Sequence, residues 1–305
     1  MKILILGNSS IFKRKVYLGL KNFRNLEIEV ASRGKVIKKK LISKSYNSYS
    51  DALNKTEAKL VYISLINSEH YKWALKALNK HKHVIVDKPI TTSFNETKNL
   101  IKIAKKKKLL LSEAIVFQYD LRFKKVTENL DLNKSTKIFC KFHIPKLQKN
   151  NFRYFRKYGG GCLNDMSPYA SYLINFFFKN KNFTFIKNNK YYFNKLINKF
   201  DISLRSKKVS LDASFSFDND YKNQIEIHNN SKIFYIDYFF SPPINKKLKI
   251  KVYDKLKSNQ KIINFNRQNV FYSYFVDIFK LIKKNKFNFF YKEINDREKI
   301  KKKIS

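Results

Sequence analysis

The sequence is poor in the residues that most often interrupt regular structure. Its 305 residues include only six Gly, five Pro, two Cys and one Trp. Two cysteines, Cys140 and Cys162, exclude a disulfide scaffold and a Cys-based zinc site, so we expect no metal and a reducing, cytoplasmic environment. The apolar runs are all far shorter than the ~20 residues that span a bilayer, so no membrane segment is expected.

Acidic residues are also scarce, with 23 Asp and Glu against 65 Lys and Arg and a formal net charge of +42. A basic patch of this strength would attract nucleic acid or another anion. The lysines, however, are spread along the whole chain together with Asn, Ile, Phe and Tyr, residues that all have AT-rich codons. No RNA-binding signature, zinc-finger spacing or basic heptad is present. We therefore attribute the charge mainly to composition bias.

What the chain does contain is a hydrophobic fraction of 43%, with 16% aromatic residues, which is enough for a large core. The first half alternates strands and helices joined by short loops, a pattern that predicts a doubly wound parallel sheet. The expected strands are 2–6, 26–31, 59–64, 83–86 and 109–113, and the expected helices are 11–23, 50–54, 70–80 and 93–106.

The second half has a different pattern. A strand at 137–144 precedes a helix at 164–178, and most later segments alternate apolar and polar residues with the period of two that is typical of antiparallel strands. These strands are expected at 183–193, 201–204, 209–217, 224–228, 232–239, 248–253 and 261–265. A helix at 271–284 is expected to be the last long element, with Lys301–Lys303 in a frayed basic tail.

The first strand-to-helix turn reads Gly7-Asn8-Ser9-Ser10-Ile11. A dinucleotide-binding turn has the pattern G-x-G-x-x-G, of which only the first glycine is present, since Ser9 and Phe12 replace the others. Backbone amides at the helix start and the two serine hydroxyls would still suit a phosphate. The alternative is an ordinary turn with a helix cap.

The second strand is followed by Ser32 and Arg33. An NAD site usually has Asp or Glu here for the ribose 2′-hydroxyl, whereas a hydroxyl and a guanidinium suit the 2′-phosphate of NADP. This favours NADP over NAD. The alternative is a surface turn in a basic protein.

Two later segments combine unusual residues with a strand end or a helix start. Asp87-Lys88-Pro89 follows a buried run, at the strand ends where ligands bind in open α/β sheets.

Half of all the glycines stand together at 159–161. This suggests a backbone that needs a positive φ angle or approaches a ligand closely. The glycines precede Asp165 and Tyr169, which lie on one helix face. A carboxylate and a phenol on one face can bind a polyol and exchange its proton. The alternative is a common glycine-rich loop with Asp165 placed for the helix dipole.

Together these segments resemble the glucose–fructose oxidoreductase, inositol dehydrogenase and rhizopine-catabolism family (Gfo/Idh/MocA). Asn67 and His70 resemble its asparagine–histidine loop, Asp87-Lys88-Pro89 its Glu-Lys-Pro motif, and Ser112-Glu113-Ala114 its next strand end. Phe152-Arg153 and Gly159–Asp165 resemble its FR…GGG-x-L-x-D entry to the substrate helix. The match covers a little over half the chain. It implies a Rossmann dinucleotide-binding domain at 1–118 and, at 119–305, a substrate domain with a large open sheet that often mediates homo-oligomerisation.

The resemblance implies hydride transfer between NAD(P) and a hydroxyl or carbonyl carbon of a sugar, nucleotide sugar or cyclitol. Lys88 would be the catalytic lysine, Asp165 would orient the substrate, and Tyr169 stands where many members have a catalytic His and some have Tyr. The expected substrate-binding residues, for a small sugar-like and conceivably anionic molecule, are Lys88, Arg153, Asp165 and Tyr169. The expected cofactor-binding residues are Gly7, Asn8, Ser9, Ser10, Ile11, Ser32, Arg33, Leu65, Asn67, His70, Asp87, Lys88 and Glu113.

The chain departs from the family pattern at the turn after Gly7, at Ser167 in place of a common glycine, and at Tyr172, where many members have Asp. Substrate contacts are therefore expected to differ. Two other hypotheses stay open. One is a non-catalytic, Rossmann-derived binding or regulatory protein, motivated by the missing glycines, and the other is a nucleic-acid binder driven by charge.

Overall fold

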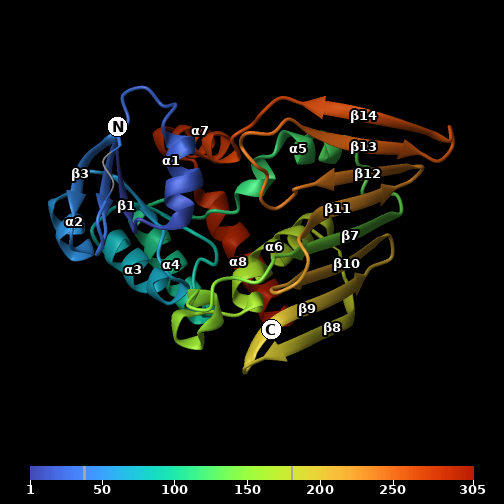
Figure 1. Ribbon diagram of the computed structural model, residues 1–305, viewed down its shortest axis with the longest axis horizontal. Coiled ribbons are helices and arrows are strands. Elements are labelled where there is room, and N and C mark those ends of the chain that lie inside the picture. Colours follow the sequence, from blue (N-terminus) through green and yellow to red (C-terminus); the bar gives the residue numbers. More distant parts are fainter. Residues whose placement is uncertain (37–38, 180) are drawn as a thin grey trace. The chain divides into compact units, whose positions relative to one another are not determined.

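The computed structural model describes residues 1–36, 39–179 and 181–305, and the chain divides into two compact units (Figure 1). The first unit comprises residues 1–115, 157–159 and 271–299, and the second comprises 116–156, 160–270 and 300–305. The chain first passes between units near the division expected at 118. The return of residues 271–299 to the first unit differs from the continuous C-terminal domain that we expected.

The first unit is built on a six-stranded sheet with the order β3-β2-β1-β4-β5-β6. All neighbouring strands are parallel, which confirms the predicted doubly wound sheet. The strand β3 was not predicted, because most of its side chains face solvent and leave no apolar pattern. The strands are β1 (Lys2–Leu6), β2 (Glu27–Ala31), β3 (Ile42–Tyr46), β4 (Leu60–Ile63), β5 (His83–Val86) and β6 (Leu111–Glu113).

The helices between these strands agree in position with the sequence pattern, although the first is shorter and begins with a π-turn. Apolar side chains such as Trp73, Ala77 and Leu78 bury one face of α3 against the sheet. The elements are η1 (Phe12–Val16), α1 (Tyr17–Leu20), α2 (Tyr49–Lys55), η2 (Asn67–Glu69), α3 (His70–Asn79) and α4 (Phe94–Lys107).

Most of the last two helices, α7 (Val270–Lys283) and α8 (Asn288–Ile304), belongs to the first unit. On α7, the hydroxyl of Tyr274 lies 2.9 Å from that of Ser112, and on α8 Tyr291 donates to the carbonyl oxygen of Leu109 at 2.5 Å. The expectation of a frayed tail at Lys301–Lys303 was wrong, because these residues form the last turn of α8. Only a narrow apolar face of α8 is buried, and the many lysines around it hid the helix from the sequence pattern.

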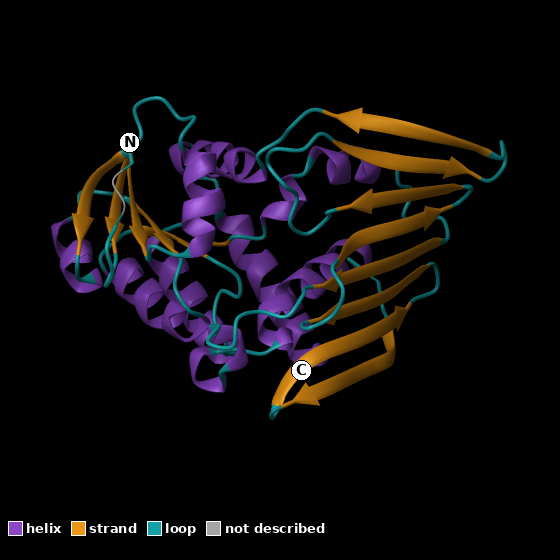
Figure 2. Cartoon of the chain, viewed as in Figure 1, coloured by secondary structure: helices purple, strands orange, loops and turns teal. Residues whose placement is uncertain are grey.

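The second unit is built on an eight-stranded sheet with the order β14-β13-β12-β11-β7-β10-β9-β8, which can be followed from the strand labels of Figure 1. Figure 2 shows the strands of this sheet as orange arrows. Only β7 and β10 pair in parallel, so the prediction of a mostly antiparallel sheet is confirmed. The strands are β7 (Thr136–His143), β8 (Thr184–Phe193), β9 (Leu196–Arg205), β10 (Val209–Ser216), β11 (Lys222–Asn229), β12 (Lys232–Asp237), β13 (Leu248–Asp254) and β14 (Asn259–Phe265).

One face of this sheet is apolar and packs on the helix α6 (Cys162–Phe177). Alternate residues of β7 and β10, such as Ile138, Phe142 and Phe215, are buried there. The shorter helical elements of this unit are η3 (Val116–Tyr119), α5 (Leu121–Thr127), η4 (Phe152–Tyr154) and η5 (Arg156–Tyr158). Among the helices described in the whole chain, none has the length and apolar character needed to cross a membrane.

Candidate active site

The turn after β1 brings the backbone of Gly7 close to the end of β4. A Cβ atom on residue 7 would lie 2.1 Å from the carbonyl oxygen of Ser64, and the φ angle of +106° is one that side chains disfavour. The amide of Gly7 donates to the carbonyl oxygen of Ala31 at 2.9 Å, which ties the same turn to the end of β2. Glycine is therefore required at this position of the predicted dinucleotide turn.

Ser9, which replaces the second glycine, is bonded within the protein. Its hydroxyl accepts from the amide of Phe12 at 3.0 Å and lies 2.6 Å from the hydroxyl of Ser64. Ser64 in turn donates to Asp87 at 2.6 Å, and the hydroxyl of Tyr62 donates to the same carboxylate. Burial raises the pKa of Asp87 although both hydrogen bonds oppose the shift. This chain of hydroxyls links the turn after β1 to the residue that precedes Lys88.

The other residues expected to bind the cofactor in this region are more open. Ser10 is exposed, and Asn8, Ile11 and Leu65 are half-buried, with the Asn8 amide donating to the carbonyl oxygen of Lys35 at 3.0 Å. These positions line the start of the first helix and the end of β4, as the sequence predicted.

The turn after β2 presents the guanidinium of Arg33 to solvent. The Arg33 side chain is 73% exposed, and its guanidinium lies 5.5 Å from the centre of the Tyr49 ring. Its Nη2 lies 3.9 Å from the Glu69 carboxylate, a distance at which an exposed ion pair is weak. The buried hydroxyl of Ser32 accepts from the amide of Gly34 at 3.1 Å and so shapes the turn.

Asn67 and His70 were expected to bind the cofactor, but their side chains are buried against the backbone. Asn67 donates to the carbonyl oxygen of Gly159 at 2.9 Å. The ring nitrogens of His70 lie 2.7 and 3.1 Å from the carbonyl oxygens of Pro89 and Leu65. Burial lowers the pKa of His70 although both carbonyl groups oppose the shift. These contacts hold the loops together, and the part of the two residues in cofactor binding stays a prediction.

Lys88 follows β5 and is joined to Pro89 by a cis peptide bond. The next amide, that of Ile90, donates to the buried carboxylate of Glu113 at 2.9 Å. The second oxygen of Glu113 accepts from Nη1 of Arg297 on α8 at 2.6 Å. Glu113 was predicted as a cofactor residue, and the structure places it beneath the loop that carries Lys88. No sequence pattern predicts Arg297 as a partner of Glu113, because the two residues lie 184 positions apart.

In the second unit, the glycine segment leads directly into α6. A Cβ atom on Gly160 would lie 2.5 Å from the carbonyl oxygen of Arg153, and the amide of Gly161 donates to that oxygen at 2.8 Å. The Nε of Arg153 lies 3.1 Å from the carboxylate of Asp165, which is buried. The glycines thus allow the chain around Arg153 to pack against the helix start, and the two predicted substrate residues form an ion pair.

Tyr169 lies one helical turn after Asp165 on α6 and is half-buried among aromatic rings. Its ring centre lies 5.8 Å from that of Phe117, 5.4 Å from that of Phe142 and 5.1 Å from that of Phe240. The departures Ser167 and Tyr172 lie on the same helix, and Tyr172 packs edge-on against Phe117. The aromatic surroundings hold the Tyr169 ring in place while leaving part of it accessible.

A family model matches the N-terminal part of the chain. Residues 2–115 match the model of the oxidoreductase family with an NAD-binding Rossmann fold, which is the Gfo/Idh/MocA family. The match covers 114 of the 305 residues. The resemblance drawn from the motifs is thereby confirmed.

Curated relatives also match only part of the chain. A dTDP-3,4-didehydro-2,6-dideoxy-alpha-D-glucose 3-reductase from Saccharopolyspora spinosa is 32% identical over 126 residues, which cover 40% of this chain and 38% of that protein. An uncharacterized oxidoreductase from Rhizobium meliloti is 28% identical over 175 residues, or 54% of this chain and 52% of that protein. The chain thus matches about two fifths to one half of the length of these relatives.

Solved structures share the whole fold at low identity. A 3-ketoreductase from Actinomadura kijaniata in complex with NADP and TDP-benzene has a TM-score of 0.90 at 18% identity, covering 99% of this chain and 96% of that chain. A dehydrogenase from Clostridium difficile has a TM-score of 0.81 at 18% identity, covering 100% and 98%. The fold of the chain is therefore one that these solved structures share.

The ion pair beneath Lys88 yields a stability prediction. Replacing Arg297 with Met leaves the buried Glu113 carboxylate without its cation, which we expect to lower the free energy of unfolding by about 3–5 kcal/mol. The half-exposed Arg205, whose Nη2 lies 3.0 Å from Asp212, provides a matched control. Arg205→Met should cost about 1 kcal/mol or less.

Urea denaturation of the full chain measures both variants. The double variant Glu113→Gln/Arg297→Met should recover part of the loss, because the amide still accepts from Ile90 and carries no charge. Equal losses for the two arginine variants would contradict the assignment of Glu113 and Arg297 as a buried pair.

Proposed function

We propose that the protein is an NADP-preferring oxidoreductase that transfers hydride between the nicotinamide and a hydroxyl or carbonyl carbon of a sugar, with nucleotide sugars as the substrate class. The observation that carries this proposal is the turn after β1, where Gly7 meets the Ser64 carbonyl and the hydroxyl chain leads to Asp87 beside Lys88. The relative from Saccharopolyspora spinosa, whose name is that of a reductase of a dTDP-linked sugar, supports it, as do the NADP and TDP-benzene bound to a structural neighbour.

The described residues fit an NADP molecule. Gly7 allows a diphosphate to approach the backbone, and the exposed Ser10 stands at the start of the first helix, where amides favour anions. Arg33 offers an exposed guanidinium that can take a 2′-phosphate in place of its weak contact with Glu69. Asn67, His70 and Glu113 act in the proposal by fixing the loops, since the Nδ2 of Asn67, both ring nitrogens of His70 and both carboxylate oxygens of Glu113 have partners within the protein.

The bound nicotinamide would supply or accept the hydride. Lys88 is assigned to the reacting oxygen as a cation and proton carrier, and Tyr169 is assigned as the partner that gives or takes the proton. Asp165 is assigned to a substrate hydroxyl, with the ion pair to Arg153 holding the carboxylate oriented. These roles follow the family motif position by position.

We also propose assembly of copies through the polar face of the eight-stranded sheet and a cytoplasmic location. Exposed Phe139 packs on His228 in the middle of that face, and Asp212 pairs there with Arg205. Sedimentation equilibrium tests the assembly, since a monomer at all concentrations would refute it.

The proposed location is consistent with the two cysteines, which are both free and buried, as expected in a reducing compartment. Cell fractionation tests the location.

The cofactor preference should depend on Arg33. We expect NADPH to bind more tightly than NADH. Arg33→Ala should lower the ratio of the two affinities by about tenfold or more, because an Arg–phosphate contact is worth at least about 1.4 kcal/mol. Fluorescence titration of the full chain with each nucleotide measures the effect. Arg24→Ala, an exposed arginine of the same unit, is the control and should change neither affinity. Failure of both nucleotides to bind at millimolar concentration would refute the proposed function.

Turnover should depend on Lys88. Lys88→Met should abolish NADPH oxidation on a panel of dTDP- and UDP-linked ketosugars while NADPH still binds, because the lysine acts on the reacting oxygen. The exposed Lys98→Met on α4 serves as the matched control and should keep full activity. Cofactor binding without turnover on any panel member would favour the non-catalytic alternative, for which Ser9 in place of glycine is the structural argument. Unchanged turnover in Lys88→Met would remove Lys88 from its role.

A further inference from the structure

The segment that follows β12 contributes to the surroundings of Tyr169 but lies outside the regular sheet. β12 ends at Asp237, and Tyr238 has a φ angle of +51° that turns the chain away from the strand direction. Phe239 and Phe240 follow and are both buried. Phe240 packs against Tyr169 at 5.1 Å and nearly parallel to Phe142, also at 5.1 Å. Something other than the strand ladder must therefore fix this turn.

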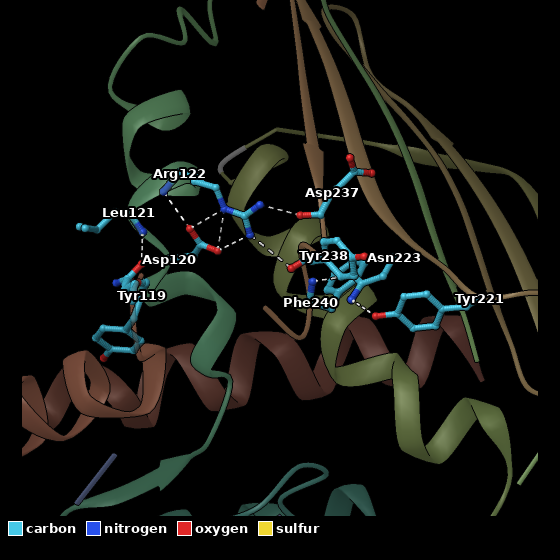
Figure 3. Close-up of polar contacts among 10 residues, drawn as sticks. Tyr119, Asp120, Leu121, Arg122, Tyr221, Asn223, Asp237, Tyr238 and Phe240 are labelled. Atoms are coloured by element: carbon cyan, nitrogen blue, oxygen red, sulfur yellow. Dashed lines mark hydrogen bonds and ion pairs between the residues drawn. The ribbon is translucent and has the colours of Figure 1, made fainter. Parts of the chain in front are cut away.

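A buried arginine holds the carbonyl groups of the turn (Figure 3). Arg122 at the start of α5 is 1% exposed, and its guanidinium donates to the carbonyl oxygens of Asp237 at 2.6 Å and Tyr238 at 3.3 Å. Asp120 supplies the counter-charge, with Nη2 of Arg122 donating to its carboxylate at 2.6 Å. Because the fork is planar, fixing it on Asp120 also fixes the direction of its other donors.

An asparagine holds the amide side of the same turn. Asn223 on β11 is 4% exposed, and its Oδ1 accepts from the amide of Phe240 at 2.8 Å. Its Nδ2 donates to the hydroxyl of Tyr221 at 3.0 Å, and its backbone carbonyl accepts from the amide of Phe239 at 3.2 Å. Figure 3 shows Arg122 and Asn223 on either side of the turn. The turn is thus held from both sides by buried polar side chains.

We propose that Arg122 and Asn223 are positioning residues for Tyr169 and act through the ring of Phe240. A buried ion pair is a costly way to stabilise a fold, since apolar residues of similar volume often do as well. Here the ion pair of Arg122 and Asp120 fixes the irregular turn after β12. Phe240 in this turn packs on Tyr169, the proposed proton-transfer group. The assignment of Tyr169 to proton transfer rests on the proposed function, whereas its positioning by Phe240 is a property of the free protein.

The test reads the Tyr169 ring directly. We would incorporate 3-fluorotyrosine at position 169 of the full chain and record its ¹⁹F NMR signal without cofactor or substrate. Phe240→Leu and Asn223→Ala should each shift the signal and broaden it severalfold, because the ring loses a fixed neighbour. Asn223→Ala is the more informative variant, since it leaves the ring of Phe240 unchanged and removes the hydrogen bond that holds the Phe240 amide.

Two controls separate positioning from general damage. Phe200→Leu makes the same change at a fully buried ring that stacks on Phe215 at 4.9 Å, and it should leave the fluorine signal in place. Tyr221→Phe removes the partner of Asn223 Nδ2 but keeps the bond from Asn223 to Phe240, so the signal should again stay native-like. A shift of equal size in Phe200→Leu, or an unchanged signal in Asn223→Ala, would overturn the proposal.

The catalytic consequence is measured separately. With a substrate found in the panel above, Phe240→Leu and Asn223→Ala should lower kcat by about 10- to 100-fold, the scale of a small misplacement of a reacting group. NADPH affinity should stay unchanged in both variants. A fall in NADPH affinity alone would contradict positioning of Tyr169. The outcome could also separate the two proposals. If the fluorine signal changes in the variants as expected but the wild-type protein shows no turnover, the proposed function is refuted and the positioning of Tyr169 stands.

Discussion

The first unit depends on the close approach between Gly7 and the carbonyl oxygen of Ser64. Only 2.1 Å would separate that oxygen from a Cβ atom at position 7, so the ends of the parallel strands β1 and β4 lie in close contact. This contact puts Ser9 within hydrogen-bond distance of Ser64, and Ser64 within reach of Asp87. One steric constraint therefore sets the position of the turn that would hold a diphosphate and of the residue that precedes Lys88.

Much of the fold was predictable because it rests on local patterns. Buried runs such as Ile3–Leu6 and Val84–Val86 are typical of parallel strands, and they were assigned correctly. Elements whose buried face is narrow were missed. β3 has a mostly exposed side, and α8 buries Phe290, Tyr291 and Ile294 among lysines and other polar residues, so neither has the average hydropathy of a core element. Their place is set by packing on distant parts of the chain.

The candidate site was predictable at positions where the backbone leaves no room for a side chain and therefore requires glycine. The glycine triplet at 159–161 was recognised because glycine is so rare in this chain, and Gly160 indeed leaves no room for a side chain beside Arg153. The functions of single polar residues were harder to separate. Asn67, His70 and Glu113 fit the family pattern, yet they hold loops through buried hydrogen bonds, a distinction that only coordinates reveal.

Arginine and lysine both contribute to the formal net charge of +42, but they differ in their structural roles. The sequence contains nine arginines, and three of them pair with buried carboxylates: Arg122 with Asp120, Arg153 with Asp165 and Arg297 with Glu113. Arg122 and Arg297 each direct different guanidinium nitrogens at different acceptors, and an ammonium group does not provide several donors in such fixed directions. A composition that replaces arginine with lysine wherever a point charge is enough would leave arginine where the fork is required. The exposed Arg33 at the end of β2 makes only a weak contact with Glu69, and for this reason the proposed function assigns its guanidinium to a bound phosphate.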